Sequence, residues 1–112
     1  MECNLKPNLT NKIYITKGDY QVERIKLDNQ EQFLQYSDVV LTVRQYVEGP
    51  IVFSKSVHLD EVSDHVDIEI LPEDTINLDY KEYCYDVKYT FDGKPYTIIK
   101  NSIFEVGVKI SE

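Results

Sequence analysis

Several residue types are scarce in this sequence of 112 residues, which has no tryptophan, one methionine, two cysteines, four glycines and four prolines. Four scattered glycines cannot form the glycine-rich loop that cradles nucleotide phosphates. Apolar runs are no longer than three residues, as at 39–41, whereas a membrane-spanning helix needs ~20. The sequence therefore argues against a phosphate-loop enzyme and against a membrane-spanning protein.

Cations are also in the minority, with 12 Lys and Arg against 20 Asp and Glu and a net charge of −8. Binding to duplex DNA or to anionic lipid depends on clustered Lys and Arg, so we expect neither duplex nucleic acid nor a membrane as a partner. No basic segment followed by an apolar one opens the chain, which predicts no signal peptide and synthesis in a cytoplasm. In such a reducing compartment Cys3 and Cys84 are expected to be free thiols, with a disulfide as the alternative.

Hydrophobic residues make up 42% of the chain, enough to build the core of one domain of this length. Residues 1–11 are polar and show no periodicity, which predicts a flexible N-terminal arm. Residues 12–112 are expected to form a single domain.

Short segments with alternating apolar and polar residues, separated by turn signals, fill this domain. We expect strands at 12–16, 20–27, 38–46, 51–58, 66–70, 82–91, 96–99 and 104–110. The alternation slips near Glu23 and Arg24, which predicts a β-bulge in the second strand.

Strands with one apolar face must pack face to face, so the pattern predicts an all-β fold. We expect a two-sheet antiparallel sandwich, immunoglobulin-like, with seven to eight strands. One short helical turn is predicted in the range Pro72–Leu78, where acidic residues follow the proline. The residues expected to form turns and a tyrosine corner are Asp74, Thr75, Tyr83, Asp92 and Gly93.

The segment from Pro72 to Tyr85 is similar to the corner of immunoglobulin domains, in which an Asp precedes a tyrosine two residues before a cysteine. Here Asp74 stands ten residues before Cys84, and no tryptophan is present to pack on a disulfide. The pattern therefore favours the sandwich architecture without membership of the antibody family.

Acidic residues are dense between 60 and 69, with His58 and His65 beside them. A divalent-metal or paired-carboxylate site is one interpretation, and a solvated loop and strand face is the simpler one that we prefer. No metal-ligand spacing and no nucleophile–base pair is evident, since Cys84 lies on a strand between two tyrosines. We expect no enzyme activity, no catalytic residue, no metal and no cofactor.

Nine tyrosines are the strongest bias of the composition. Tyr83, Tyr85 and Tyr89 share one face of a predicted strand and are expected to pack in the core. Tyrosine is also enriched at protein interfaces. The tyrosines outside that face that form the candidate interaction surface are Tyr46, Tyr80 and Tyr96.

From Ile68 to Ser111 the sequence resembles small β-sandwich modules in virion proteins of tailed bacteriophages and prophages, of the amino-terminal baseplate and fibre type. The residues that carry the resemblance are Asp74–Thr75, Leu78, Tyr80, Tyr83, Tyr85–Val87, Asp92–Gly93, Thr97–Ile98, Phe104 and Val106, together with Lys17–Tyr20 near the start. The chain departs from these modules at Lys81 and near Ser102, where they usually have glycine.

This resemblance implies a non-catalytic structural or interaction module, made in the bacterial cytoplasm and then incorporated in a virion. Its partners would be other protein subunits of the particle, and a homo-oligomer is included among the expected assemblies. Two alternatives stay open. One is a β-sandwich that binds carbohydrate or another ligand on its tyrosines, and the other is an acidic nucleic-acid mimic that inhibits a host protein.

Overall fold

A computed structural model describes residues 11–27 and 32–108 of the chain. In these ranges the protein is mostly β, with seven strands and one short helical turn, as the sequence predicted. The strands are β1 (Ile13–Thr16), β2 (Gln21–Lys26), β3 (Asp38–Arg44), β4 (Ile51–His58), β5 (His65–Ile70), β6 (Lys81–Phe91) and β7 (Lys94–Gly107), and the turn is α1 (Pro72–Thr75). The predicted arm, apart from Asn11, lies outside the described residues.

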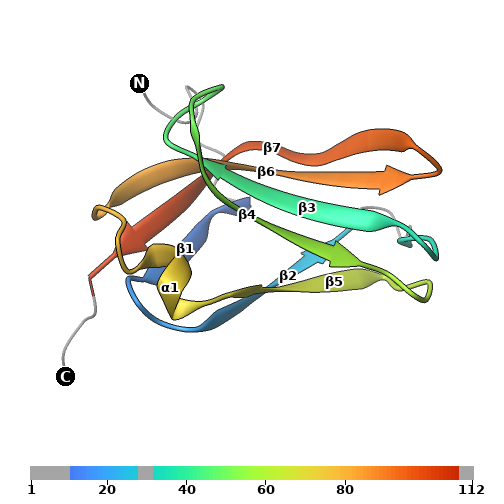
Figure 1. The fold of residues 1–112 in the computed structure, drawn as a ribbon, viewed down its shortest axis with the longest axis horizontal. Helices are drawn as coiled ribbons and strands as arrows, with labels where there is room; N and C mark the ends of the chain where they lie inside the picture. Colours follow the sequence, from blue (N-terminus) through green and yellow to red (C-terminus); the bar gives the residue numbers. More distant parts are fainter. Residues whose placement is uncertain (1–10, 28–31, 109–112) are drawn as a thin grey trace.

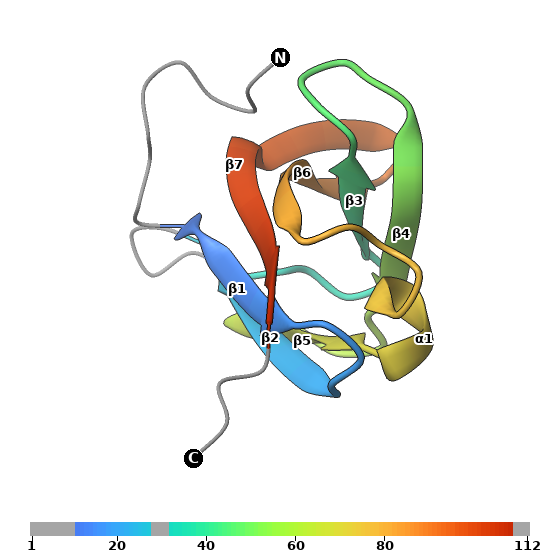
Figure 2. The same ribbon diagram turned by 90° about the vertical axis from the view of Figure 1, so that its left-hand side faces the viewer.

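Five strands form one sheet in the order β1-β7-β6-β3-β4, and β2 and β5 form a second. The five-strand sheet curls like half of a barrel over the two-strand sheet, as Figures 1 and 2 show. Neighbouring strands are antiparallel except β1 and β7, which run parallel with Ile13 opposite Phe104. The prediction of an antiparallel immunoglobulin sandwich is therefore wrong, because the larger sheet is mixed.

The turn after β1 explains the parallel pair. Gly18 has a φ of 82° and its N–H donates to the Thr75 hydroxyl at 2.9 Å, so the turn is fixed against α1. The chain then crosses into the smaller sheet instead of folding back beside β1. Lys17 meanwhile donates its N–H to the carbonyl of Gly107 at 3.0 Å, which keeps β1 along β7. Two consecutive strands thus belong to different sheets.

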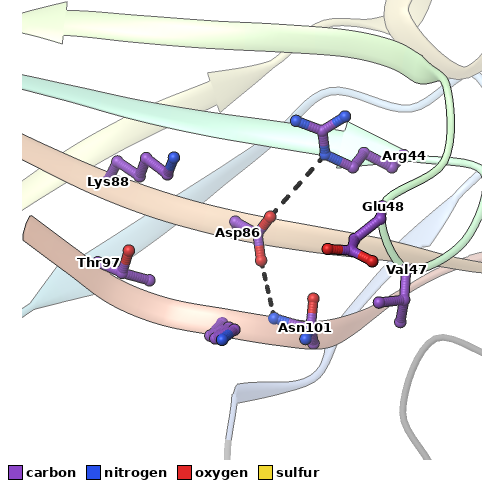
Figure 3. Close-up of a pocket in the computed structure, with 8 residues that line it drawn as sticks. Arg44, Val47, Glu48, Asp86, Lys88, Thr97 and Asn101 are labelled. Carbon is purple, nitrogen blue, oxygen red and sulfur yellow. Dashed lines mark hydrogen bonds and ion pairs between the residues drawn. The ribbon is translucent and has the colours of Figure 1, made fainter.

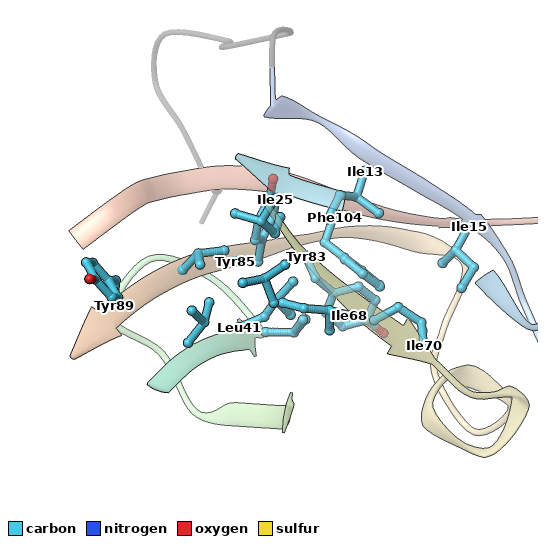
Figure 4. Packing of buried hydrophobic residues seen from close by; sticks show 14 of the residues in the cluster. Ile13, Ile15, Ile25, Leu41, Ile68, Ile70, Tyr83, Tyr85, Tyr89 and Phe104 are labelled. Atoms are coloured by element: carbon cyan, nitrogen blue, oxygen red, sulfur yellow. The ribbon is translucent and has the colours of Figure 1, made fainter. Parts of the chain in front are cut away.

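The core fills the space between the two sheets (Figure 4). Tyr83, Tyr85 and Tyr89 alternate along β6 and are all buried, in keeping with the face that they share in the sequence. Phe104 is fully buried, and its ring lies edge-on to Phe53 at 5.7 Å. Burial of large rings from several strands is the main force that holds the sheets together.

Two sequence predictions about local structure are wrong. The ladder between β2 and β5 is continuous through Glu23, so β2 has no bulge. Register shifts occur instead between β6 and β7 and between β3 and β4. The strands predicted at 96–99 and 104–110 are one strand, β7, over the described residues. Phe33, which lies between the strands predicted at 20–27 and 38–46, is fully buried, edge-on to Tyr89 at 5.1 Å.

A two-residue turn joins β6 to β7, with φ of 52° at Asp92 and 75° at Gly93. Such a turn requires left-handed backbone at both residues. A Cβ at position 93 would meet no atom within 4 Å, so only backbone strain opposes a side chain there. We expect Gly93→Ala to lower the free energy of unfolding by about 1 kcal/mol, measured by urea titration. Asp92→Asn, which suits the same turn, should leave the midpoint nearly unchanged, and equal midpoints for both variants would contradict this.

Candidate functional site

A groove crosses the outer face of β3, β6 and β7, on the side of the sheet away from the core (Figure 3). Its volume is ≈ 750 Å³. We call it the outer groove, and its lining residues are Arg44, Val47, Glu48, Asp86, Lys88, Thr97, Lys100 and Asn101. It was not predicted from the sequence.

A bulge in β7 shapes the outer groove. Between the pairs Tyr85–Ser102 and Val87–Ile99, β6 contributes one residue and β7 contributes two. The two residues that β7 contributes are Lys100 and Asn101, and both lie opposite Asp86 of β6. In a regular strand adjacent side chains point to opposite faces, so only one of the two would reach the outer face. The bulge therefore places both of them in the groove.

The carboxylate of Asp86 supports this bulge. One of its oxygens accepts the backbone N–H of Asn101 at 2.8 Å, and the other lies 4.0 Å from Nε of Arg44. Both interactions are drawn in Figure 3. Asn101 has a φ of 51°, in the left-handed region, which asparagine adopts more readily than most residues but still less readily than glycine. The hydrogen bond to Asp86 thus stabilises a backbone conformation that the residue alone disfavours.

The outer groove gathers three cations and two anions on a chain whose net charge is −8. Arg44 donates to the carbonyl of Gly49 at 2.9 Å in addition to its approach to Asp86. Lys88 and Lys100 have no hydrogen bond or ion pair from their side chains to any residue that the structure describes. Two ammonium groups on neighbouring strands are therefore available to an anionic ligand.

The structure does not bring the three candidate tyrosines together. Tyr46 and Tyr80 lie at the end of the larger sheet where β6 begins, and Tyr96 pairs with Tyr89 near its opposite end. All three are exposed, at 40%, 59% and 52%. The ammonium group of Lys17 sits 4.6 Å from the centre of the Tyr80 ring, a cation–π contact. They are separate exposed rings on different parts of the fold.

Tyr96 belongs to a second cavity, of ≈ 570 Å³, at the end of the fold near the β6–β7 turn. Its lining is mostly apolar and consists of Leu27, Gln32, Leu34, Tyr89, Phe91, Tyr96, Thr97 and Ile98. The two hollows share Thr97, on β7. No charged side chain lines this cavity among the residues described, so it differs in chemistry from the outer groove.

Tyr83 lies at the corner between α1 and β6. Its hydroxyl accepts the N–H of Asp79 at 2.9 Å and donates to the carbonyl of the same residue at 3.3 Å. Burial raises the pKa of Tyr83 above its usual value, because the charged phenolate would lose solvation. The partner of the corner is the backbone of Asp79, four residues upstream, and not Asp74, which the comparison with immunoglobulin corners had suggested.

Asp74 and Thr75 instead fix α1 to its surroundings. The Asp74 carboxylate accepts the N–H of Leu71 at 2.8 Å and binds the Lys55 ammonium group at 2.7 Å. Thr75 is fully buried, and its hydroxyl accepts the N–H of Gly18. These contacts tie α1 to β4 and to the β1–β2 turn, which is a structural role.

The acidic segment near the two histidines forms separate surface pairs. His58 lies 2.9 Å from Asp38, and His65 lies 2.6 Å from Asp64. The hydrogen bond from His65 lowers the pKa of Asp64. No group of three or more His, Cys, Asp or Glu side chains able to hold a metal ion occurs in residues 11–27 and 32–108. Over the same part of the chain, no helix is long and apolar enough to cross a membrane.

Cys84 lies on β6 against Ile103 and Val47 and is 2% exposed. It is disulfide-bonded, so the expectation of a free thiol is wrong for this residue. That expectation followed from the compartment alone and took no account of local geometry. The other cysteine of the sequence, Cys3, lies outside the described residues.

Comparison with protein-family models, with curated proteins and with solved structures found no match to this chain. Because a fold alone does not define a function, the function has to be argued from the chemistry of the site. The outer groove, with its two unpaired lysines, is the site that offers most to a ligand.

Proposed function

We propose that this protein is a non-catalytic docking module of a phage or prophage particle, which binds another protein subunit of the particle. The observation that carries the proposal is the outer groove on the face of an acidic domain, where Lys88 and Lys100 have no ion-pair partner among the described residues. The strands beneath are hydrogen-bonded along their length, so the groove is a preformed surface. Preformed surfaces bind with a smaller entropy cost than loops that must order.

The assignment to a particle is supported by the resemblance to virion modules. Its residues fall at positions that define the architecture: Asp92–Gly93 forms the turn between the two long strands, and Phe104 lies in the core. Tyr83 forms the corner. A resemblance carried by such positions concerns the framework of the domain, and it supports a shared framework more than a shared binding site.

The alternative of a carbohydrate-binding domain has less support. Sugar rings stack on aromatic side chains, and none lines the outer groove. Tyr96 lines the apolar cavity instead, away from Tyr46 and Tyr80. The three exposed rings therefore offer single contacts and not one stacking platform.

The acidic-mimic alternative needs a row of carboxylates that stay available to a basic protein. On β5, Asp67 is engaged by the Arg24 guanidinium at 2.9 Å, and Glu69 accepts the Tyr20 hydroxyl. Two of the carboxylates on which that hypothesis depends are thus occupied within the domain. This favours docking through the outer groove over mimicry of nucleic acid.

Particles produced by the bacterium that encodes this chain test the proposal. We expect mass spectrometry of purified particles to find the chain at a fixed ratio to the other structural proteins. Incorporation of the double variant Lys88→Glu and Lys100→Glu should fall by about fivefold or more, because the docking charges are reversed.

Lys94→Glu is the matched control, since this exposed lysine lies on the same strand outside the groove. It should be incorporated as the natural chain is. Absence of the natural chain from particles would overturn the proposed function. Normal incorporation of the double variant would overturn the role of the groove.

A further inference from the structure

We infer that the outer groove selects an acidic peptide segment, and that Asp86 is a positioning residue of this site. Its role is to set the bulge that brings Lys100 to the outer face near Lys88. The inference rests on the proposed function for the identity of the site. It goes further by naming the chemistry of the partner and the device that arranges the cations.

The charge distribution indicates an acidic partner. Lys88 and Lys100 have no counter-ion among residues 11–27 and 32–108, and a neutral ligand would not supply one. The domain as a whole is strongly acidic, so the long-range field repels anions and the groove is a local exception. Each exposed ion pair contributes little, and a ligand with several carboxylates is needed to gain useful affinity.

The rest of the lining favours a peptide over other polyanions. Single-stranded nucleic acid binds to grooves that combine cations with aromatic rings, and the lining has no aromatic ring. It does supply the hydroxyl of Thr97 and the side-chain amide of Asn101, groups that pair well with peptide N–H and C=O. A single apolar residue, Val47, offers a contact for an apolar side chain.

The two ends of the groove also differ in charge. Figure 3 shows Lys88 and Thr97 at one end, Val47 and Glu48 at the other, and Asp86 between them. Carboxylates of a bound segment should therefore lie over the lysines, and an apolar residue of the segment should lie over Val47. Glu48 repels a carboxylate placed at the wrong end, so it favours one orientation of the ligand.

Asp86 presents an apparent conflict, because an anion in a site for acids should weaken binding. Its hydrogen bond to the N–H of Asn101 resolves the conflict. Without that bond the left-handed backbone at Asn101 loses a stabilising interaction, and we expect β7 to shift toward regular alternation. Lys100 and Asn101 would then point to opposite faces, and the groove would lose one of them.

Substitutions at position 86 separate charge from geometry. Asp86→Asn removes the charge and keeps an oxygen that accepts the N–H of Asn101, so it should bind an acidic peptide at least as tightly as the natural chain. Asp86→Ala removes both the charge and the acceptor. Its affinity for an acidic peptide should fall by about fivefold or more, even though the repulsion between Asp86 and the peptide is gone. Asn101→Gly, which adopts left-handed backbone freely, should restore the part of the binding that depends on the position of Lys100 when it is added to Asp86→Ala, although the amide of Asn101 is lost.

The probe is a fluorescein-labelled peptide of six glutamates followed by two valines, titrated by fluorescence anisotropy at low ionic strength. The same peptide with lysine in place of glutamate, single-stranded oligothymidylate and polygalacturonate are the comparison ligands. We expect binding of the glutamate peptide alone, weakened by added salt and by Lys88→Glu. The three-bond coupling between the amide and Cα protons of Asn101 reports its φ in each folded variant, and circular dichroism establishes folding.

Equal affinity of Asp86→Ala and Asp86→Asn for the glutamate peptide would overturn the positioning role. So would a left-handed Asn101 retained in Asp86→Ala. Tighter binding of oligothymidylate or polygalacturonate than of the glutamate peptide, or no binding of the peptide, would overturn the acidic-peptide assignment. Incorporation into particles is measured separately, so the proposed function can stand when this inference fails, and the converse also holds.

Discussion

Replacing Phe104 by alanine is expected to lower the free energy of unfolding by about 3–5 kcal/mol. The side chain is fully buried, and its ring lies 5.7 Å from that of Phe53 on β4 and 6.4 Å from that of Tyr85 on β6. The cavity left by the ring would border three strands of the larger sheet, and no single strand can move to fill it. Urea titration followed by circular dichroism measures the loss.

Ile51→Ala is the control for this experiment, because Ile51 is also on a strand of the larger sheet but is 58% exposed. We expect it to cost less than about 1 kcal/mol. Since domains of this size are stable by only about 5–15 kcal/mol, the Phe104→Ala protein should be close to the limit of folding at room temperature. Similar losses for the two variants would contradict the central place of Phe104 in the core.

The second large effect is expected at the ion pair between Lys55 and Asp74, whose side chains are only 21% and 13% exposed. Lys55→Met would leave the Asp74 carboxylate largely buried, with the N–H of Leu71 as its one remaining partner in the part of the chain that the structure describes. Loss of one partner from a mostly buried pair costs more than the pair contributes, and we expect about 2–3 kcal/mol here. Thermal and urea unfolding measure this loss of stability in the single variant Lys55→Met and in the double variant Lys55→Met with Asp74→Asn. The double variant should recover part of the loss.

The pair between Arg24 and Asp67 is the matched comparison. Its N···O distance is similar, at 2.9 Å against 2.7 Å, but its side chains are 55% and 42% exposed. Solvent screens such a pair, so Arg24→Met should cost less than about 1 kcal/mol. If Arg24→Met destabilised the domain as much as Lys55→Met, the burial of the Lys55 pair would not be the cause of its effect.

Local patterns predicted those parts of the fold that depend on local chemistry. The alternation in β6 predicted that its tyrosines share one buried face, and Pro72 predicted the start of a short helical turn. The partner of β1 could not be predicted, because alternation shows which face is buried but not which strand lies alongside. Phe33 was missed for a related reason, since its burial depends on Tyr89, which is distant in sequence.

The outer groove was missed although a signal for it is present in the sequence. Lys100, Asn101 and Ser102 are three consecutive polar residues that interrupt an apolar pattern, and the interruption was interpreted as a gap between two strands. Only the ladder with β6 shows that the strand continues and bulges toward Asp86. An interrupted alternation is therefore as consistent with a bulge as with a loop, and the deciding residue is on the neighbouring strand.

The parallel pairing of β1 with β7 has a mechanical consequence. The chain enters β1 at Ile13 and leaves β7 at Gly107, and these residues are three ladder positions apart in register. A force that pulls the two ends apart along the strands acts on every hydrogen bond between β1 and β7 at once, in shear, instead of opening them one after another. We therefore expect the first and last strands of the described chain to resist mechanical tension applied along the strands.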